Sequence, residues 1–140
     1  MAMHLPVNHP LRSLYRRLAF FAGLLMLVLG VVGFFATQGD PLFEASGATA
    51  LGLRTNPAFS YASIGTGVLV TLATLLGRNV DRFAYLWIGV GHLIVGLAMM
   101  LLMNDPKTNY LNFTIVTCVV SFVIGSLLAT AGMYVKVQRS

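Results

Sequence analysis

The sequence contains few charged residues and almost no cysteine. Charged side chains make up 9% of its 140 residues, whereas a soluble domain typically has about 25%. Apolar residues account for 57%, so the chain cannot cover a water-facing surface with polar groups. This composition excludes a soluble globular protein and predicts a single domain, residues 1–140, that is surrounded by lipid.

The one cysteine, Cys118, lies inside an apolar stretch. It has no partner for an internal disulfide, and no spacing typical of a metal site surrounds it. The sequence also lacks a phosphate-binding loop, a serine–histidine–aspartate set and a Cys-x-x-Cys motif. We therefore expect no cofactor, no metal and no enzymatic activity. The net charge of +5 comes from residues that flank apolar segments, which favours lipid headgroups over nucleic acid as the partner.

Four uncharged apolar runs dominate the chain. They cover residues 18–36, 58–76, 83–103 and 113–135, and each has 19 to 23 residues. A helix needs roughly 20 apolar residues to cross a hydrocarbon core about 30 Å thick. The runs also lack the two-residue alternation of a barrel strand. We predict an all-α fold, a transmembrane four-helix bundle.

The first run resembles the core of a secretory signal, because three arginines precede it. Its length exceeds the usual signal core of about 7–15 residues, and no small-x-small cleavage site follows in "FFATQGD". We expect the helix to be retained. Residues 10–17 form a short basic amphipathic lead-in that extends this helix, with apolar side chains at i, i+3, i+4 and i+7, namely Leu11, Leu14, Tyr15 and Leu18.

Basic residues are distributed unequally between the ends of the runs. Seven of the nine lie on one side: Arg12, Arg16, Arg17, Arg78, Arg82, Lys136 and Arg139. Only Arg54 and Lys107 lie on the other side, with most of the acidic residues. Because Lys and Arg accumulate in cytoplasmic segments, we expect a multi-pass protein of the plasma membrane with both termini in the cytoplasm.

The two halves of the chain resemble each other. An offset of 65 residues places Arg17, Asp40 and Pro41 over Arg82, Asp105 and Pro106. An offset of 60 places residues 64–66 over residues 124–126, the third loop being shorter than the first. The pattern indicates two duplicated helical hairpins that run in the same direction across the membrane.

Small residues recur on one face of each run. In the last run they follow at spacings of three and four, at Cys118, Ser121, Gly125, Ala129 and Gly132. Helices in a bilayer associate by close packing of small residues, since lipid gives no hydrophobic drive between them. We predict that Ser121, Gly125, Ala129 and Gly132 form a helix-packing face.

His92 lies near the middle of the third run, with Gly89 and Gly96 on its face. An intramembrane imidazole usually faces the bundle and finds a hydrogen-bond partner, for example a Ser or Thr of another helix. We favour this structural role. Proton relay or ligand contact stays open as an alternative, whereas haem ligation is disfavoured because His4 and His9 lie in the tail.

Arg54 lies in "LGLRTNPAFS", on the side with few basic residues. We interpret it as an interfacial arginine that reaches the headgroups or pairs with Asp40 or Glu44. An anion or headgroup site is the functional alternative. The next residues, Asn56 and Pro57, are typical of a helix N-cap and first helical position, so they predict the start of the second helix.

Four stretches, "HPLRSLYR", "LGLRTNPAFS", "LLGRNVDRF" and "CVVSFVIGSLLATAGMY", span most of the chain. Together they resemble a family of small four-pass actinobacterial membrane proteins known only as a domain of unknown function. The resemblance implies a four-helix integral protein of the plasma membrane. It assigns no catalytic or binding residue.

The missing chemistry and the small-residue faces favour a non-enzymatic accessory or scaffold subunit of a larger membrane complex. An ion-coupled pump normally keeps an intramembrane carboxylate, and none of the four runs contains one. An oligomeric channel or facilitator for a small solute, built from a homo-oligomer with His92, Ser and Thr facing inward, stays open as the alternative.

Overall fold

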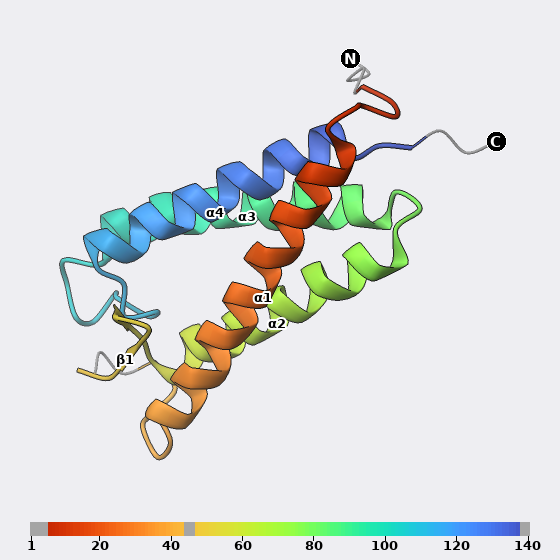
Figure 1. Ribbon diagram of the computed structural model, residues 1–140. Helices are drawn as coiled ribbons and strands as arrows, with labels where there is room; N and C mark the ends of the chain where they lie inside the picture. Colours follow the sequence, from red (N-terminus) through yellow and green to blue (C-terminus); the bar gives the residue numbers. More distant parts are fainter. Residues whose placement is uncertain (1–5, 44–46, 138–140) are drawn as a thin grey trace.

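Four α-helices account for most of residues 6–43 and 47–137, the part of the chain that the computed structural model describes (Figure 1). They are α1 (Arg12–Ala36), α2 (Pro57–Leu76), α3 (Val80–Leu102) and α4 (Ile115–Tyr134). Two short strands, β1 (Thr49–Ala50) and β2 (Leu53–Arg54), precede α2. Each helix is long and apolar enough to cross a membrane. The predicted all-α fold with four membrane-length helices is confirmed.

The helices differ from the uncharged runs at their ends. α1 begins at Arg12, before the uncharged run, so the basic lead-in extends the helix as its apolar spacing predicts. α3 begins at Val80 rather than at residue 83 and takes in the charged residues Asp81 and Arg82. α4 is shorter than its run, because Thr114 caps it and Tyr134 ends it. Charge marks the end of an apolar run, but it does not end a helix whose charges are paired.

Local sequence explains where α2 begins. The Asn56 side chain accepts a hydrogen bond from the Phe59 backbone N–H at 2.8 Å, and Pro57 occupies the first helical position. Just before it, Leu51 and Gly52 connect β1 to β2 with φ values of 51° and 85°. Two consecutive positive φ values define the type I′ turn, whose twist matches that of paired strands. The chain therefore turns back tightly and enters α2 with its first amides capped.

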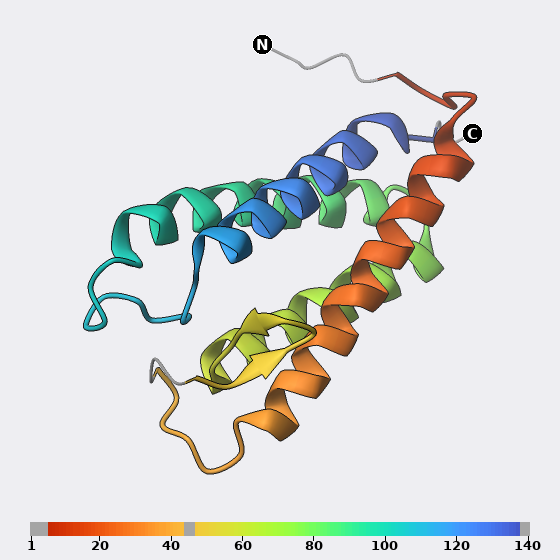
Figure 2. The same cartoon turned by 60° about the vertical axis from the view of Figure 1, so that its left-hand side comes forward.

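The helices form two hairpins, α1 packed on α2 and α3 packed on α4. Figures 1 and 2 show that the hairpins meet where α1 begins and α4 ends, which we call the terminal end. They diverge towards the opposite end, which carries the β-hairpin and the loop between α3 and α4 and which we call the loop end. The space between them widens in the same direction.

A glycine of α2 lets the first hairpin close. A Cβ atom built on Gly67 would lie 2.6 Å from the backbone nitrogen of Leu27 and 2.8 Å from the carbonyl oxygen of Gly23. Real Cβ atoms do not approach backbone so closely, so the backbones of α1 and α2 come this near at Gly67 because the position has no side chain.

The second hairpin closes in the same way. A Cβ atom on Gly125 of α4 would lie 2.8 Å from the carbonyl oxygen of Gly89 and 3.0 Å from the backbone nitrogen of Leu93. Gly89 stands 66 positions after Gly23, and Gly125 stands 58 positions after Gly67. The offset of 60 pairs Gly65 with Gly125, but a Cβ atom on Gly65 meets nothing within 4 Å, so the glycine equivalent to Gly125 at the helix crossing is Gly67 and that part of the sequence match is wrong. The two hairpins share this glycine contact between their helices.

The outer surface of the helices is apolar. Phe21, Trp87 and Leu101 are 65%, 67% and 83% exposed. In water such side chains would associate, whereas in a bilayer they face lipid of the same polarity. Inside, Met26, Val70, Leu128 and Tyr85 belong to one core cluster on the terminal side, and a second cluster around Phe59 and Phe113 lies on the loop side.

Candidate functional site

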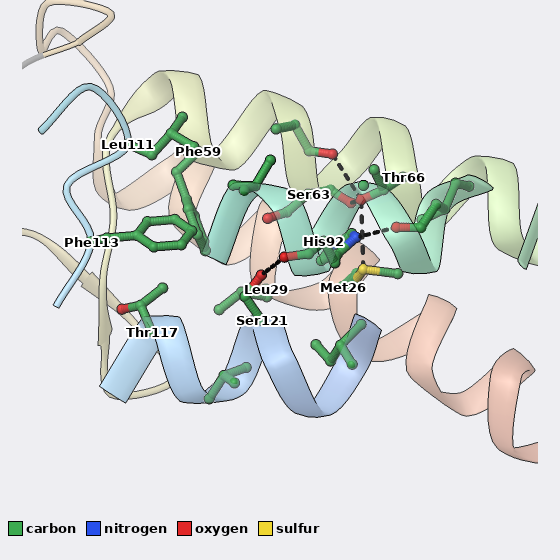
Figure 3. A pocket seen from close by; sticks show the side chains of 16 residues that line it. Met26, Leu29, Phe59, Ser63, Thr66, His92, Leu111, Phe113, Thr117 and Ser121 are labelled. Atoms are coloured by element: carbon green, nitrogen blue, oxygen red, sulfur yellow. Dashed lines mark hydrogen bonds between the residues drawn. The ribbon is translucent and has the colours of Figure 1, made fainter. Parts of the chain in front are cut away.

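A cavity of about 260 Å³ lies between the diverging hairpins (Figure 3). All four helices and the segment before α4 line it. Most of the lining side chains are apolar, among them Met26, Leu29, Phe59 and Phe113. Ligand pockets range from roughly 300 to 1,000 Å³, so the cavity suits a small molecule. The hairpins create it because they pack tightly within themselves and separate at this level.

Among the described residues that line the cavity, His92 is the one with a titratable side chain. Its Nδ1 lies 2.9 Å from the carbonyl oxygen of Ile88, one turn earlier in α3. A carbonyl oxygen only accepts, so Nδ1 donates its hydrogen there. In a neutral imidazole the other nitrogen, Nε2, then carries the lone pair and is an acceptor. His92 therefore offers the cavity a hydrogen-bond acceptor.

The partner of the imidazole lies in its own helix. The sequence predicts a hydrogen-bond partner, for example a Ser or Thr of another helix, and the structure supplies the Ile88 carbonyl of the same helix. The interhelical bond goes instead from the Ser121 hydroxyl to the backbone carbonyl of His92, at 2.7 Å. The reason is geometric: the α3–α4 contact is close enough for a short hydroxyl to reach the backbone, while the longer imidazole points to the wider space between the hairpins.

Other hydroxyls of the lining are already bonded. Thr66 donates to the Ala62 carbonyl at 2.9 Å, and Thr117 takes part in the capping box of α4. Neither Nε2 of His92 nor the Ser63 hydroxyl has a hydrogen-bond partner among residues 6–43 and 47–137. These two groups are the polar contacts that the cavity can offer a guest.

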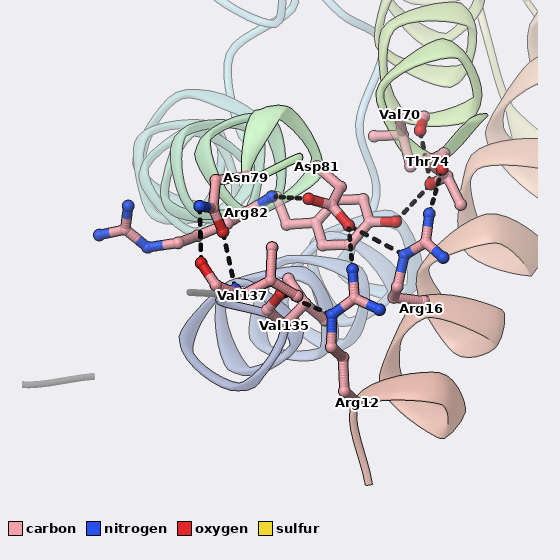
Figure 4. Close-up of polar contacts among 10 residues, drawn as sticks. Arg12, Arg16, Val70, Thr74, Asn79, Asp81, Arg82, Val135 and Val137 are labelled. Carbon is pink, nitrogen blue, oxygen red and sulfur yellow. Dashed lines mark hydrogen bonds and ion pairs between the residues drawn. The ribbon is translucent and has the colours of Figure 1, made fainter. Parts of the chain in front are cut away.

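A second polar cluster lies at the terminal end, around Asp81 (Figure 4). This carboxylate is fully buried in the first turn of α3. Its Oδ2 lies 2.9 Å from Nε of Arg16 and 3.8 Å from Nη2 of Arg12, both of α1. Its Oδ1 accepts from the backbone N–H of Arg82 at 2.9 Å. Burial of the charge is tolerated because both oxygens have partners.

The same cluster reaches α2 and α4. Arg16 also donates to the carbonyl oxygen of Thr74 in α2, and the Thr74 hydroxyl pairs with the hydroxyl of Tyr85 in α3. Arg12 donates to the carbonyl oxygen of Val135, just after α4, at 3.0 Å. The terminal end of both hairpins is thus held by one network of charged and polar groups.

Sequence reasoning missed this network. Arg16 and Asp81 are 65 positions apart, and both were treated as flanking charges outside the apolar runs. One signal was present: Asp81 is the single acidic residue on the side with most basic residues. A lone carboxylate among arginines favours an ion pair, but only the tertiary structure shows which arginine it meets.

Arg54 lies apart from both sites. It is exposed on β2, where its backbone pairs with Thr49, and it does not line the cavity. Among the described residues it forms no ion pair, so the expected pairing with Asp40 is not present. The other candidate partner, Glu44, lies outside the described residues.

The residues after Arg54 join the two loops at the loop end. The Asn56 amide nitrogen donates to the carbonyl oxygen of Tyr110 at 2.7 Å. The Asn112 amide nitrogen donates to the carbonyl oxygen of Thr55 at 2.8 Å. Thr55, Asn56 and Asn112 are all buried. The motif "LRTNP" therefore has a structural role, which is to hold the loop between α3 and α4 against the start of α2.

The small residues of α4 that the sequence predicts as a helix-packing face lie where α4 contacts α3. Ser121, Gly125 and Gly132 are buried, and Ala129 is half-buried. A Cβ atom on Gly132 would lie 2.8 Å from the backbone nitrogen of Leu86. Substitution by a larger residue on this face would separate the two helices.

No group of three His, Cys, Asp or Glu side chains within residues 6–43 and 47–137 has the arrangement of a metal site. No curated protein and no solved structure matches the chain. A family model described as a domain of unknown function (DUF4383) matches residues 16–134. The match includes Arg16, Asp81 and His92 and extends over both hairpins. The chain therefore belongs to the DUF4383 family, a family of unknown function.

Proposed function

We propose that the protein is a non-enzymatic accessory or scaffold subunit of a larger membrane complex, located in the plasma membrane with both termini in the cytoplasm. The proposal starts from the four membrane-length helices and from the excess of basic residues on the terminal side. An accessory subunit needs a rigid body and an outer face for a partner, and it needs no reactive groups.

One observation carries the proposal: the buried polar side chains are used to hold the chain together. Asp81 binds Arg16, Asn56 caps α2, and Ser121 bonds α4 to α3. In an enzyme, by contrast, a nucleophile and a base would lie within hydrogen-bond reach of each other at a site open to substrate. The polar groups described here instead form contacts that stabilise the fold.

The interior of a single chain also argues against a channel. Val70, Tyr85 and Leu128 are fully buried, and they lie on the terminal side of the cavity along α2, α3 and α4. Beyond them lies the network around Asp81. A solute that entered the cavity would meet this packed core. A channel would therefore need an axis between several copies, and that arrangement is the alternative function.

Site-specific photo-crosslinking in native membranes tests the proposal. A crosslinking amino acid at the outward position Trp87, which is 67% exposed, should capture one partner protein in stoichiometric amount. The same amino acid at Leu128, which is fully buried, is the matched control and should capture none. Deletion of the captured partner should lower the abundance of this chain, because an accessory subunit is stable in its complex.

Two results would count against the accessory role. One is a chain that purifies alone in mild detergent and crosslinks only to lipid. The other is a crosslink from position 87 to a second copy within a closed ring, which would favour the channel.

A further inference from the structure

We propose that the cavity between the hairpins binds a neutral, lipid-soluble phenol or alcohol, whose hydroxyl donates a hydrogen bond to Nε2 of His92. The proposal goes beyond the accessory role and does not depend on it. It concerns a small-molecule site inside one chain, whereas the accessory role concerns the outer surface.

The walls select an apolar body. Met26 and Leu29 of α1, Phe59 of α2 and Phe113 of the segment before α4 all face the same space of about 260 Å³ (Figure 3). A cavity with apolar walls holds water poorly and gains free energy when an apolar guest fills it. Its volume lies near the lower limit of ligand pockets, which suits a single ring with a short chain.

The uncharged lining of the cavity favours a neutral guest. The described residues that line the cavity include no Lys, Arg, Asp or Glu. An ionised group would have no counter-charge there, and burial of an unpaired charge is costly. Because the cavity lies between membrane-length helices, a guest that dissolves in lipid can approach it at the same depth.

The imidazole selects a donor. Nδ1 of His92 is engaged by the Ile88 carbonyl, so Nε2 accepts and does not donate. The bond of Nδ1 also orients the ring, and the Ser121 hydroxyl fixes the backbone of α3 at this residue by its bond to the His92 carbonyl. A hydroxyl placed at Nε2 forms a hydrogen bond without reorganisation of the wall, whereas an ether or ketone at the same place leaves Nε2 without a partner.

Two isomeric probes distinguish recognition of a hydroxyl donor by His92 from simple filling of the apolar cavity. 4-Propylphenol carries a hydroxyl donor, while 4-ethylanisole has the same atoms and no donor. Each is titrated into the full-length protein in nanodiscs, with ¹⁵N-labelled histidine as the reporter, and partition into protein-free nanodiscs is measured in parallel. We expect the phenol to shift the His92 Nε2 resonance and to bind about tenfold more tightly than the anisole, the effect of one hydrogen bond.

Two variants locate the site. His92→Phe keeps a planar ring but removes the acceptor, so the phenol should lose its tenfold advantage and bind like the anisole. Gly91→Leu should abolish binding of both probes, since Gly91 lines the cavity and a Cβ atom there meets no other atom within 4 Å. Gly65→Leu is the matched control: a Cβ atom at Gly65 is equally free, but the residue lies outside the cavity, and binding should not change.

Equal affinity of the two isomers for the unmodified protein would overturn the proposal, as would unchanged binding by Gly91→Leu. The proposal would also be overturned if neither probe bound. These results leave the crosslinking test of the accessory role unaffected, so the two proposals fail separately.

Discussion

Replacement of Asp81 by asparagine should weaken the contact between the two hairpins at the terminal end. In the structure this carboxylate is fully buried and lies 2.9 Å from Nε of Arg16. Asparagine keeps the size of the side chain and one oxygen acceptor, but it removes the negative charge. The arginine then stays in a partly buried position without its counter-charge.

The expected loss in the free energy of unfolding follows from how far Asp81 and Arg16 are each buried. Removal of one member of a buried ion pair costs about 3–5 kcal/mol. The side chain of Arg16 is 28% exposed, so solvent screens part of the interaction, and the amide oxygen of asparagine retains a hydrogen bond. We expect Asp81→Asn to lower the free energy of unfolding by about 2 kcal/mol, below the full cost of an isolated buried pair.

A double-mutant cycle with Arg16→Gln measures the interaction itself. Unfolding is followed in mixed micelles as the fraction of denaturing detergent rises. The double variant should be more stable than the sum of the single effects predicts, by about 1–2 kcal/mol of coupling. Arg17→Gln is the matched control, because Arg17 is the exposed neighbour of Arg16 in α1, and it should change stability by less than about 0.5 kcal/mol.

The reasoning would be refuted if Asp81→Asn unfolded like the unmodified protein, or if the effects of the two single variants were simply additive. Either result would mean that the pair does not hold α1 to α3.

Two further predictions concern the helix crossing and the loop end. Gly67→Ala should lower thermal stability in detergent far more than Gly65→Ala does, because only the Cβ atom at position 67 would press into the backbone of Leu27, at 2.6 Å. Equal melting temperatures of the two variants would show that α1 and α2 do not touch there. Asn56→Ala should cost about 1 kcal/mol from the lost N-cap, and limited proteolysis should then cut the loop at Tyr110 faster, since Asn56 also binds the Tyr110 carbonyl.

The existence of the four helices follows from the sequence, because long uncharged runs have few other stable conformations in lipid. The start of α2 was also predictable, since Asn56 and Pro57 act through local geometry. The extension of α1 to Arg12 was predictable from the apolar spacing of its basic lead-in. The start of α3 at Val80 was not, because Asp81 pairs with Arg16 of α1, a position far away in the chain.

The candidate site was predictable only in part. A histidine in an apolar run indicates a polar contact inside the bundle, and His92 does line the cavity. The cavity itself has no sequence signal, because it arises from the angle between the hairpins. That angle depends on the network around Asp81 and on the bonds of Asn56 and Asn112 between loops. Each of these is a tertiary contact.

Cysteine accessibility in intact cells tests the central claim, that four helices cross the membrane and leave α1's start and α4's end on the cytoplasmic side. In a Cys118→Ala background, single cysteines are placed at Gly47, Lys107 and Arg78, all of which are exposed. A membrane-impermeant maleimide should label positions 47 and 107 in intact cells, and it should label position 78 only after the cells are opened. Labelling of position 78 in intact cells, or protection of positions 47 and 107, would contradict this arrangement.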